Sequence, residues 1–441
     1  MTDKYAINKK SVKSISRVEK GLTPEETDQL LVKEIEHATA ENSDVWTCPD
    51  SNRREYCHSF FQYPAMMVPA VQKKLIDIVS SVVKGTKNMI DPMMGSATTL
   101  VASMENGLNC YGQDINPLAV LISKVRTGPF LVEGAKQQAM HLMKRIESDK
   151  NDKIEKEFKG INKWFKPVTQ QELSKIVRGI REEENLNVRR FFWVVLAETV
   201  RVSSNDRTST FKLHIRPEDE IDRRVFSAID VFALHLDKTL EDYEAHTVLL
   251  ANSGQLVQES YRAEVHIRIE DSKASIYCPT KEPFYDLLVT SPPYGDNKTT
   301  VTYGQYSYLP LQWIDLNDID AKATEDFLRT TLEIDSRSLG GKLTEIDSEK
   351  VDELCKQSPS FLRTRKAIEK VNDSLVKKVD AFLLDLNQTI ANIFEVMKPN
   401  SYQIWTVGNR RVGGIEIPNA AIITELIEKN RESWCQQWNG K

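Results

Sequence analysis

The stretch "TKNMIDPMMGSATTLVASMENGLNCYGQDINPLAVLISKV", residues 86–125, decides the fold of this chain. It reads twice as a short apolar strand, a turn and an apolar helix. The first unit turns at Asp91 and Gly95, and the second turns at Asp114. Strands that alternate with helices in this way are typical of a parallel sheet covered by helices. The stretch therefore predicts an α/β fold.

Both turns have features of a ligand site. Gly95 lets the backbone pass close to a ligand, and the helix that follows offers free N–H groups. A carboxylate at the end of the second strand, Asp114, can accept hydrogen bonds from both hydroxyls of a ribose. No Lys-Ser/Thr pair follows the glycine turn, so we expect a nucleoside without a triphosphate rather than a P-loop ligand. Two ordinary turns of an α/β domain are the alternative.

The rest of the chain adds helices to this framework. With 441 residues, the chain has room for two or three domains, or for one large domain with insertions. Thr23, Pro24 and Glu26 predict a capped helix near the start, and residues 379–409 predict a long helix, a turn at Pro399-Asn400 and a strand. The predicted segments are a helical extension, two α/β segments each followed by a helical insertion, and an α/β end: 1–57, 58–130, 131–260, 261–314, 315–375 and 376–441.

Composition excludes several classes of protein. Hydrophobic residues make up 40% and charged residues 28%, and no apolar run approaches the roughly 20 residues of a membrane helix. The start, "MTDKYAINKKSVK", lacks the apolar core of a secretory signal. The net charge of −5 excludes a uniformly basic nucleic-acid coat but allows a local basic cleft.

The six cysteines include no CxxC pair. Cys48, Cys57 and His58 have a spacing that fits no standard zinc site, so we expect no metal. Free thiols in a reducing cytoplasm are the simpler interpretation.

A second informative stretch is "TSPPY", residues 290–294, which directly follows the apolar run "FYDLLV". The two prolines fix φ at successive positions, so they hold the Ser291 hydroxyl and the Pro292 carbonyl rigidly at a strand end. Tyr294 supplies a flat face for stacking. A proline-terminated strand and turn is the alternative interpretation.

Together, "DPMMGSATT", "GQDINP" and "TSPPY" resemble the amino-group DNA methyltransferases, and "SFFQYPAMMVP" at 59–69 is similar to the family's additional cofactor-binding segment. The resemblance implies a Rossmann-like, S-adenosylmethionine-dependent methyltransferase fold with helical insertions. In it, residues 58–130 form the cofactor-binding half and 261–314 the catalytic half. The residues implied to bind the cofactor are Tyr63, Pro64, Asp91, Pro92, Gly95, Ser96, Thr98, Asp114, Asn116 and Asp271.

The resemblance also implies that Ser291, Pro292, Pro293 and Tyr294 form the catalytic motif. An exocyclic amine is a poor nucleophile because its lone pair is delocalised into the ring, and acceptors for its hydrogens localise that pair. The Ser291 hydroxyl and the Pro292 carbonyl suit this role, and Tyr294 can stack on a base that has left the duplex. "SPPY" rather than "DPPY" favours cytosine N4, with adenine N6 as the alternative. Cytosine-C5 methylation is excluded because the chain has no Pro-Cys pair.

Duplex DNA is the implied partner. The stretch "SSNDRTSTFKLHIRP", 203–217, suits contacts with phosphates and base edges, although an ordinary polar loop fits equally well. Its predicted DNA-binding residues are Arg207, Lys212, His214 and Arg216. We expect the two insertions to form recognition lobes of a bacterial or archaeal cytoplasmic enzyme with a cognate restriction endonuclease. A non-catalytic DNA-binding subunit and an RNA or protein methyltransferase are the rival interpretations.

Two features depart from the family pattern. Ala97 stands where the family usually has glycine, since the chain reads "GSATT" rather than "GSGTT". The family's fold usually finishes with a further strand or hairpin, which the last residues, "RESWCQQWNGK", do not resemble.

In addition, Glu270 and Asp271 follow "VHIRI" where an acidic residue can bind an adenine amino group, and a solvated turn is the alternative.

Overall fold

A computed structural model describes residues 22–48, 60–64, 66–295, 301–343 and 346–439. Its centre is a five-stranded sheet in the order β5-β2-β1-β6-β7, and every neighbouring pair in it is parallel. This is the doubly wound, Rossmann-like order, so the predicted fold class is confirmed. The strands are β1 Asn88–Asp91, β2 Asn109–Asp114, β5 Val265–Ile269, β6 Tyr285–Thr290 and β7 Met397–Trp405.

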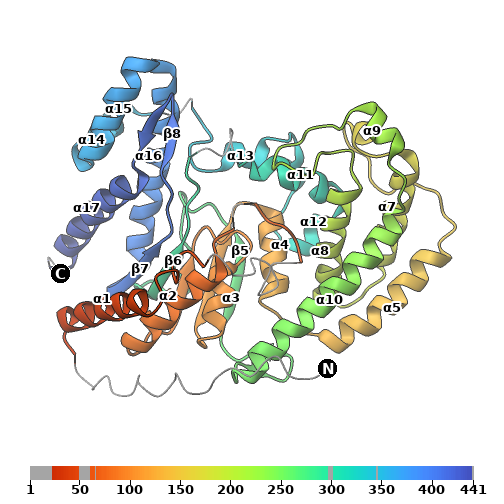
Figure 1. Cartoon of the computed structure of the whole chain (residues 1–441), viewed down its shortest axis with the longest axis horizontal. Helices are drawn as coiled ribbons and strands as arrows, with labels where there is room; N and C mark the ends of the chain where they lie inside the picture. The colour runs from red at the N-terminus through yellow and green to blue at the C-terminus, as the bar shows by residue number, and fades with distance from the viewer. Residues whose placement is uncertain (1–21, 49–59, 65, 296–300, 344–345, 440–441) are drawn as a thin grey trace.

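One group of helices covers this sheet or packs against the covering helices. Figure 1 shows the sheet in the middle of the molecule, with these helices around it. They are α1 Pro24–Glu41, α2 Pro69–Val82, α3 Thr98–Met104, α4 Pro117–Arg126, α16 Asp373–Val396 and α17 Asn419–Asn439.

Both faces of the sheet are buried, because successive side chains of a strand point to opposite sides. Met89 of β1 and Leu287 of β6 belong to the core that includes residues of α2, α3 and α4. Their neighbours Ile90 and Leu288 pack with Ile393 of α16 on the other face. This two-sided burial explains why the strands read as apolar runs rather than as alternating patterns.

Residues 131–260 form a helical lobe on one side of the sheet (Figure 1). Helix α8 lies at its centre and contacts α5, α7, α10 and α11, and residues 191–197 of it are buried. The elements are α5 Val132–Ser148, α6 Ile161–Trp164, α7 Pro167–Arg181, α8 Leu186–Ser203, α9 Glu218–Arg223 and α10 Ala228–Asn252, with the short antiparallel pair β3 Leu256–Val257 and β4 Ser260–Tyr261.

The predicted insertion at 315–375 does not form a single lobe. Its first part packs with α11 against α4 and α8, whereas α14 and α15 pack against α16 and α17 on the other side of the molecule (Figure 1). The elements are α11 Tyr303–Trp313, α12 Leu316–Ile319, the 3-10 turn η1 Glu325–Leu328, α13 Glu333–Arg337, α14 Ser348–Gln357 and α15 Pro359–Val371.

Local predictions have mixed outcomes. The capping box at α1 is confirmed, because Glu26 N–H donates to Thr23 Oγ1 (3.2 Å) and Thr23 N–H donates to the Glu26 carboxylate (2.8 Å). The predicted turn at Pro399-Asn400 is wrong: β7 continues through it with a register shift against β6, and Asn400 has φ +59°. The pairing of β7 with β6 absorbs the extra residues as a bulge.

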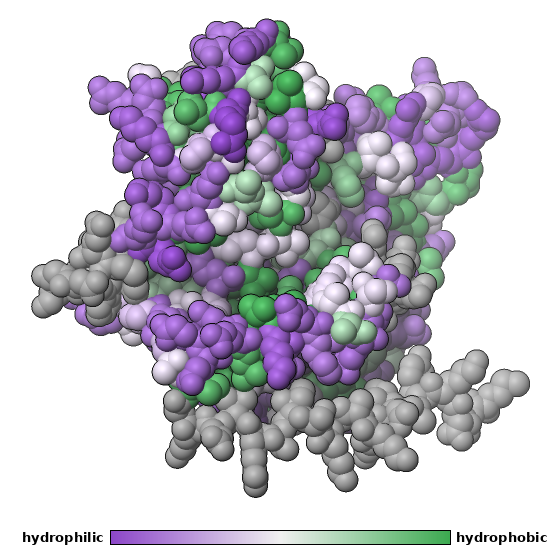
Figure 2. Space-filling view, turned by 60° about the vertical axis from the view of Figure 1, so that its left-hand side comes forward, coloured by the Kyte–Doolittle hydropathy of each residue, from purple (hydrophilic) through white to green (hydrophobic). Residues whose placement is uncertain are grey.

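The C-terminal region contains a hairpin, but not at its end. The antiparallel pair β8 Arg410–Val412 and β9 Ile415–Ile417 precedes α17, and residues 431–439 belong to that helix. Among the described residues, no helix has the length and apolar character needed to span a membrane. Figure 2 shows a mainly hydrophilic face, with hydrophobic residues gathered toward its centre.

Candidate functional site

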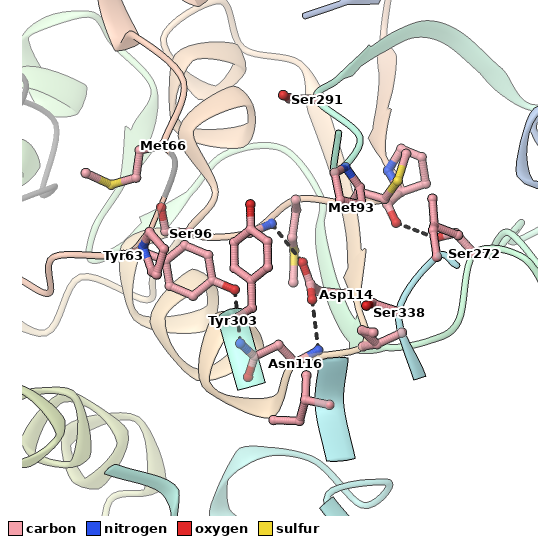
Figure 3. Close-up of a pocket in the computed structure, with 18 of the residues that line it drawn as sticks. Tyr63, Met66, Met93, Ser96, Asp114, Asn116, Ser272, Ser291, Tyr303 and Ser338 are labelled. Atoms are coloured by element: carbon pink, nitrogen blue, oxygen red, sulfur yellow. Dashed lines mark hydrogen bonds between the residues drawn. The ribbon is translucent and has the colours of Figure 1, made fainter. Parts of the chain in front are cut away.

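A cavity opens at the carboxyl ends of β1, β2, β5 and β6, where the strand order reverses direction. Ligands of open α/β sheets bind at this position. Figure 3 shows Tyr63 and Tyr303 side by side near Asn116, with Ser291 on the far side of the cavity in this view. The predicted site residues that line the cavity are Tyr63, Pro64, Pro92, Gly95, Ser96, Thr98, Asp114, Asn116, Asp271, Ser291 and Pro293.

Asp114 ends β2 and faces the cavity. Its two oxygens accept backbone N–H bonds from Gly95 (2.9 Å) and Asn116 (2.8 Å). Each carboxylate oxygen has two lone pairs, so acceptor capacity remains for a ligand. Burial raises the pKa of Asp114 to about 6, and the backbone N–H bonds oppose this shift. The carboxylate can therefore accept hydrogen bonds from a diol, which is the role predicted for it.

Asn116 connects three parts of the cavity wall. Its Oδ1 caps α4 by accepting from Leu118 N–H (3.0 Å), while its Nδ2 donates to Tyr63 Oη (3.0 Å) and Ser307 Oγ (2.8 Å). The rings of Tyr63 and Tyr303 stack with centroids 5.9 Å apart. Asn116 thus holds the Tyr63 side chain in place, and Tyr63 and Tyr303 together form an aromatic wall of the cavity.

The glycine turn between β1 and α3 has a strained backbone. Gly95 has φ +50°, and a Cβ placed there would lie 3.4 Å from Tyr63 Cε1. Ala97, the residue that replaces the family's glycine, is the N-cap of α3 and has φ +68°, in the left-handed region that disfavours alanine.

Asp91 does not line the cavity. It is fully buried beneath it, where Oδ1 accepts from Thr290 Oγ1 (2.8 Å) and Met93 N–H (3.1 Å), and Oδ2 accepts from Thr99 Oγ1 (2.5 Å). Burial raises the pKa of Asp91 to about 6. These bonds join β1, α3 and β6, so Asp91 stabilises the residues beneath the cavity.

The "TSPPY" segment leaves the end of β6 at the cavity. Ser291 and Pro293 line the cavity, and Pro292 between them is buried. Tyr294 is half-buried and lies outside the lining residues, against Gly408. The predicted catalytic segment is thus beside the predicted cofactor residues, although these come from distant parts of the chain.

Two acidic residues follow β5. Asp271 lines the cavity and accepts from Lys273 N–H (3.2 Å), and burial raises its pKa. Glu270 also lines the cavity and forms an ion pair with Lys322 (2.5 Å). The carboxylates at the end of β5 are therefore part of the cavity and not of a solvated turn.

Helices α11 and α13 and the two residues that follow α13 supply lining residues that the sequence analysis missed. They are Tyr303, Ile334, Asp335, Ser338 and Leu339. Asp335 has only 1% exposure and accepts a bond from Gly304 N–H (2.9 Å). No local motif signals these residues, because most of them lie in a segment whose sequence reads only as a helical insertion.

The predicted DNA-binding loop lies next to the cavity without lining it. Thr302 Oγ1 donates to Phe211 O (2.9 Å) and Leu213 N–H donates to Gln305 Oε1 (3.1 Å), which fastens the loop to the start of α11. Arg207 and His214 are exposed and Lys212 is half-buried, as is Arg216, whose guanidinium contacts Asp206 O (2.9 Å) and Glu220 (3.5 Å).

Comparison with known proteins decides the family. A family model described as DNA methylase matches residues 3–125. The chain is 32% identical over 429 residues to the Type II methyltransferase M.MvaI of Kocuria varians, covering 91% of this chain and 87% of that protein. It is 23% identical over 447 residues to the Type II methyltransferase M.AvaI of Anabaena variabilis, covering 95% and 86%. No solved structure matches the chain.

The chain belongs to the amino-group DNA methyltransferases. Members of this family use S-adenosylmethionine, whose sulfonium supplies an electrophilic methyl group. The cavity of the methyltransferase fits this cofactor in charge: Asp114, Glu270, Asp271 and Asp335 line it, and no lysine, arginine or histidine does so among the described residues. Carboxylates favour a cationic ligand and accept bonds from ribose hydroxyls. Of the metal ligands considered in the sequence, Cys57 and His58 lie outside the described residues.

Proposed function

We propose that this methyltransferase transfers a methyl group from S-adenosylmethionine to the exocyclic N4 of cytosine in duplex DNA. The observation that supports this most is the shared cavity: Ser291 and Pro293 line it together with Asp114 and Gly95. A methyl acceptor held at "TSPPY" then lies beside the donor. Serine at position 291, rather than aspartate, favours cytosine over adenine.

The residues of this chain act mainly by positioning. Asp114 holds the ribose of the cofactor, and Tyr63 and Tyr303 shape the wall of its pocket. The Ser291 hydroxyl and the Pro292 carbonyl accept the amine hydrogens of the target base, which localises the nitrogen lone pair. Tyr294 stacks on the base and offsets part of the few kcal/mol lost on unpairing.

The DNA is held by the loop at 203–217, which carries the predicted DNA-binding residues, and by the helices of the two insertions, 131–260 and 315–375. Arg207 and His214 are exposed next to α11, so they can reach phosphates near the target base. Because both relatives are named Type II methyltransferases, we place this chain in a restriction–modification system with a cognate endonuclease.

Product analysis tests the proposal. Purified protein is incubated with unmethylated DNA of mixed sequence and labelled S-adenosylmethionine, and the DNA is digested to nucleosides that are separated by mass. We expect the label in 4-methylcytosine and a fall of about 100-fold or more with Ser291→Ala plus Tyr294→Ala. Ser148→Ala, at an exposed site of α5, is the matched control. Label in N6-methyladenine would overturn the choice of base, and an absence of label would overturn the activity.

A further inference from the structure

The segment that follows β7 lies alongside the segment that follows β6. Thr406 N–H donates to Thr290 O (2.9 Å), directly before the "TSPPY" residues. Since β6 and β7 are parallel neighbours, their chains leave the sheet side by side at the same edge. The residues after Trp405 are thus placed to contact Tyr294 and Gly295.

Gly408 makes the closest of these contacts. A Cβ at this glycine would lie 3.0 Å from Tyr294 Cε2 and 3.3 Å from Cδ2 and Cζ. Carbon atoms in contact are normally about 3.5–4.0 Å apart, so any side chain at 408 would displace the ring by a few tenths of an ångström. Because glycine has no Cβ, the edge of the Tyr294 ring can occupy this position against residue 408.

Neighbouring polar contacts hold the two segments in this relation. Asn419, only 2% exposed, donates from Nδ2 to Gly408 O (2.9 Å) and Tyr294 O (3.4 Å). Arg410 Nη1 donates to Gly295 O, and its guanidinium lies 5.4 Å from the centre of the Phe382 ring. Ring and glycine are thus bound to one framework, and a side chain at 408 cannot be accommodated by moving the segments apart without breaking these bonds.

We infer that Gly408 is a positioning residue for the target base, because it provides the space that fixes the Tyr294 ring. The inference rests on the proposed function, in which Tyr294 stacks on the base. A misplacement of 1 Å at a reacting centre can cost about 100-fold in rate, so a displacement of a few tenths should cost about fivefold. We therefore expect a side chain at residue 408 to lower the rate of methylation as well as to disturb local packing.

The test compares Gly408→Ala and the larger Gly408→Val with wild type. We expect methylation kcat/KM on mixed-sequence DNA to fall about fivefold for alanine and further for valine, while the Kd for S-adenosylmethionine stays within about twofold. Gly134→Ala is the matched control, since a Cβ there meets only Leu131 Cβ at 3.9 Å, and we expect it to leave both quantities unchanged.

A double-mutant cycle separates positioning from a general structural effect. In the Tyr294→Ala background, Gly408→Ala should lower kcat/KM less than about twofold, because the ring that it displaces is gone. Any loss of Tm in Gly408→Ala should also be recovered in the double variant. Equal losses of activity in both backgrounds, or wild-type activity in Gly408→Ala, would overturn the inference.

Failure of the underlying function is visible separately. If the wild-type protein places no label in DNA, the proposed function fails and the inference fails with it. If Tyr294→Ala alone retains full activity on DNA, then Tyr294 does not stack on the base, and the inference fails although the methyl transfer stands. If Tyr294→Ala loses activity but the two substitutions act independently, only the role of Gly408 is overturned.

Discussion

Asp91 and Asp114 end the neighbouring strands β1 and β2, and burial raises the pKa of each to about 6. Their surroundings differ. Asp91 accepts bonds from side chains of α3 and β6 and from Met93 N–H. Asp114 instead accepts bonds from the backbone N–H groups of Gly95 and Asn116 and faces the cavity. A raised pKa alone therefore does not distinguish a carboxylate that fastens the fold from one that is available to a ligand.

The largest expected effect concerns the stability of the β1 end. Asp91→Ala should lower the free energy of unfolding by about 3 kcal/mol, because the buried hydroxyls of Thr99 and Thr290 lose their acceptor. Asp114→Ala should cost only about 1 kcal/mol, because water in the cavity can replace the carboxylate. Urea unfolding measures both, and similar costs would remove the distinction.

Cofactor affinity should show the opposite order. Asp114→Asn should weaken S-adenosylmethionine binding about tenfold, because charge-assisted bonds to the ribose are lost. Asp91→Asn should leave the Kd within about twofold, since Asp91 does not line the cavity. Isothermal titration calorimetry gives both values. Weaker cofactor binding by a fully folded Asp91→Asn variant would show that the residues beneath the cavity also determine affinity.

The two carboxylates should also respond to pH in different measurements. Since the pKa of Asp91 rises from 3.8 to about 6 on folding, its contribution to stability is present below pH 3.8 and is lost as the pH rises through about 6. Asp91→Asn should reduce this fall in unfolding free energy. Affinity for the cofactor should instead rise through about pH 6 as Asp114 ionises.

Calorimetric titrations at pH 5, 6 and 7 check the affinity arm of this prediction. The pH dependence of the Kd should persist in Asp91→Asn and flatten in Asp114→Asn. The reverse result would assign the ligand-binding carboxylate to β1.

The smallest effect lies in the backbone of the β1 turn. Ala97→Gly should raise the free energy of unfolding by about 0.5 kcal/mol, because it relieves a left-handed alanine but gains entropy in the unfolded chain. Ala102→Gly, inside α3, should instead cost about 1 kcal/mol or more. The turn after β2 has no such strain at Asn116, where φ is −87°. Chemical denaturation resolves the two signs, and destabilisation by Ala97→Gly would contradict the assignment of strain.

Much of the framework follows from short-range rules. The capping box at Thr23 and the two strand–turn–helix units were predicted correctly because caps and apolar periodicity act within a few residues. The bulge at Asn400 and the division of 315–375 between two sides of the molecule were not, because both depend on which distant elements the segment packs against.

The cavity shows the same division. Its strand-end residues, such as Asp114 and Ser291, could be predicted because they belong to short local motifs, "GQDINP" and "TSPPY", and both lie at the cavity. Asp335 enters the cavity from α13, which has no motif of its own.

The sequence by itself determined the alternating strand–turn–helix units, the acidic strand ends and the "TSPPY" segment, and hence the family. Only the tertiary structure decided that Asp91 bonds to Thr290 while Asp114 faces the cavity, and that Tyr294 lies on Gly408. The physical reason is that local hydrogen bonds and periodicity are written in neighbouring residues. The role of a buried side chain depends instead on partners that are brought to it by packing across the sheet.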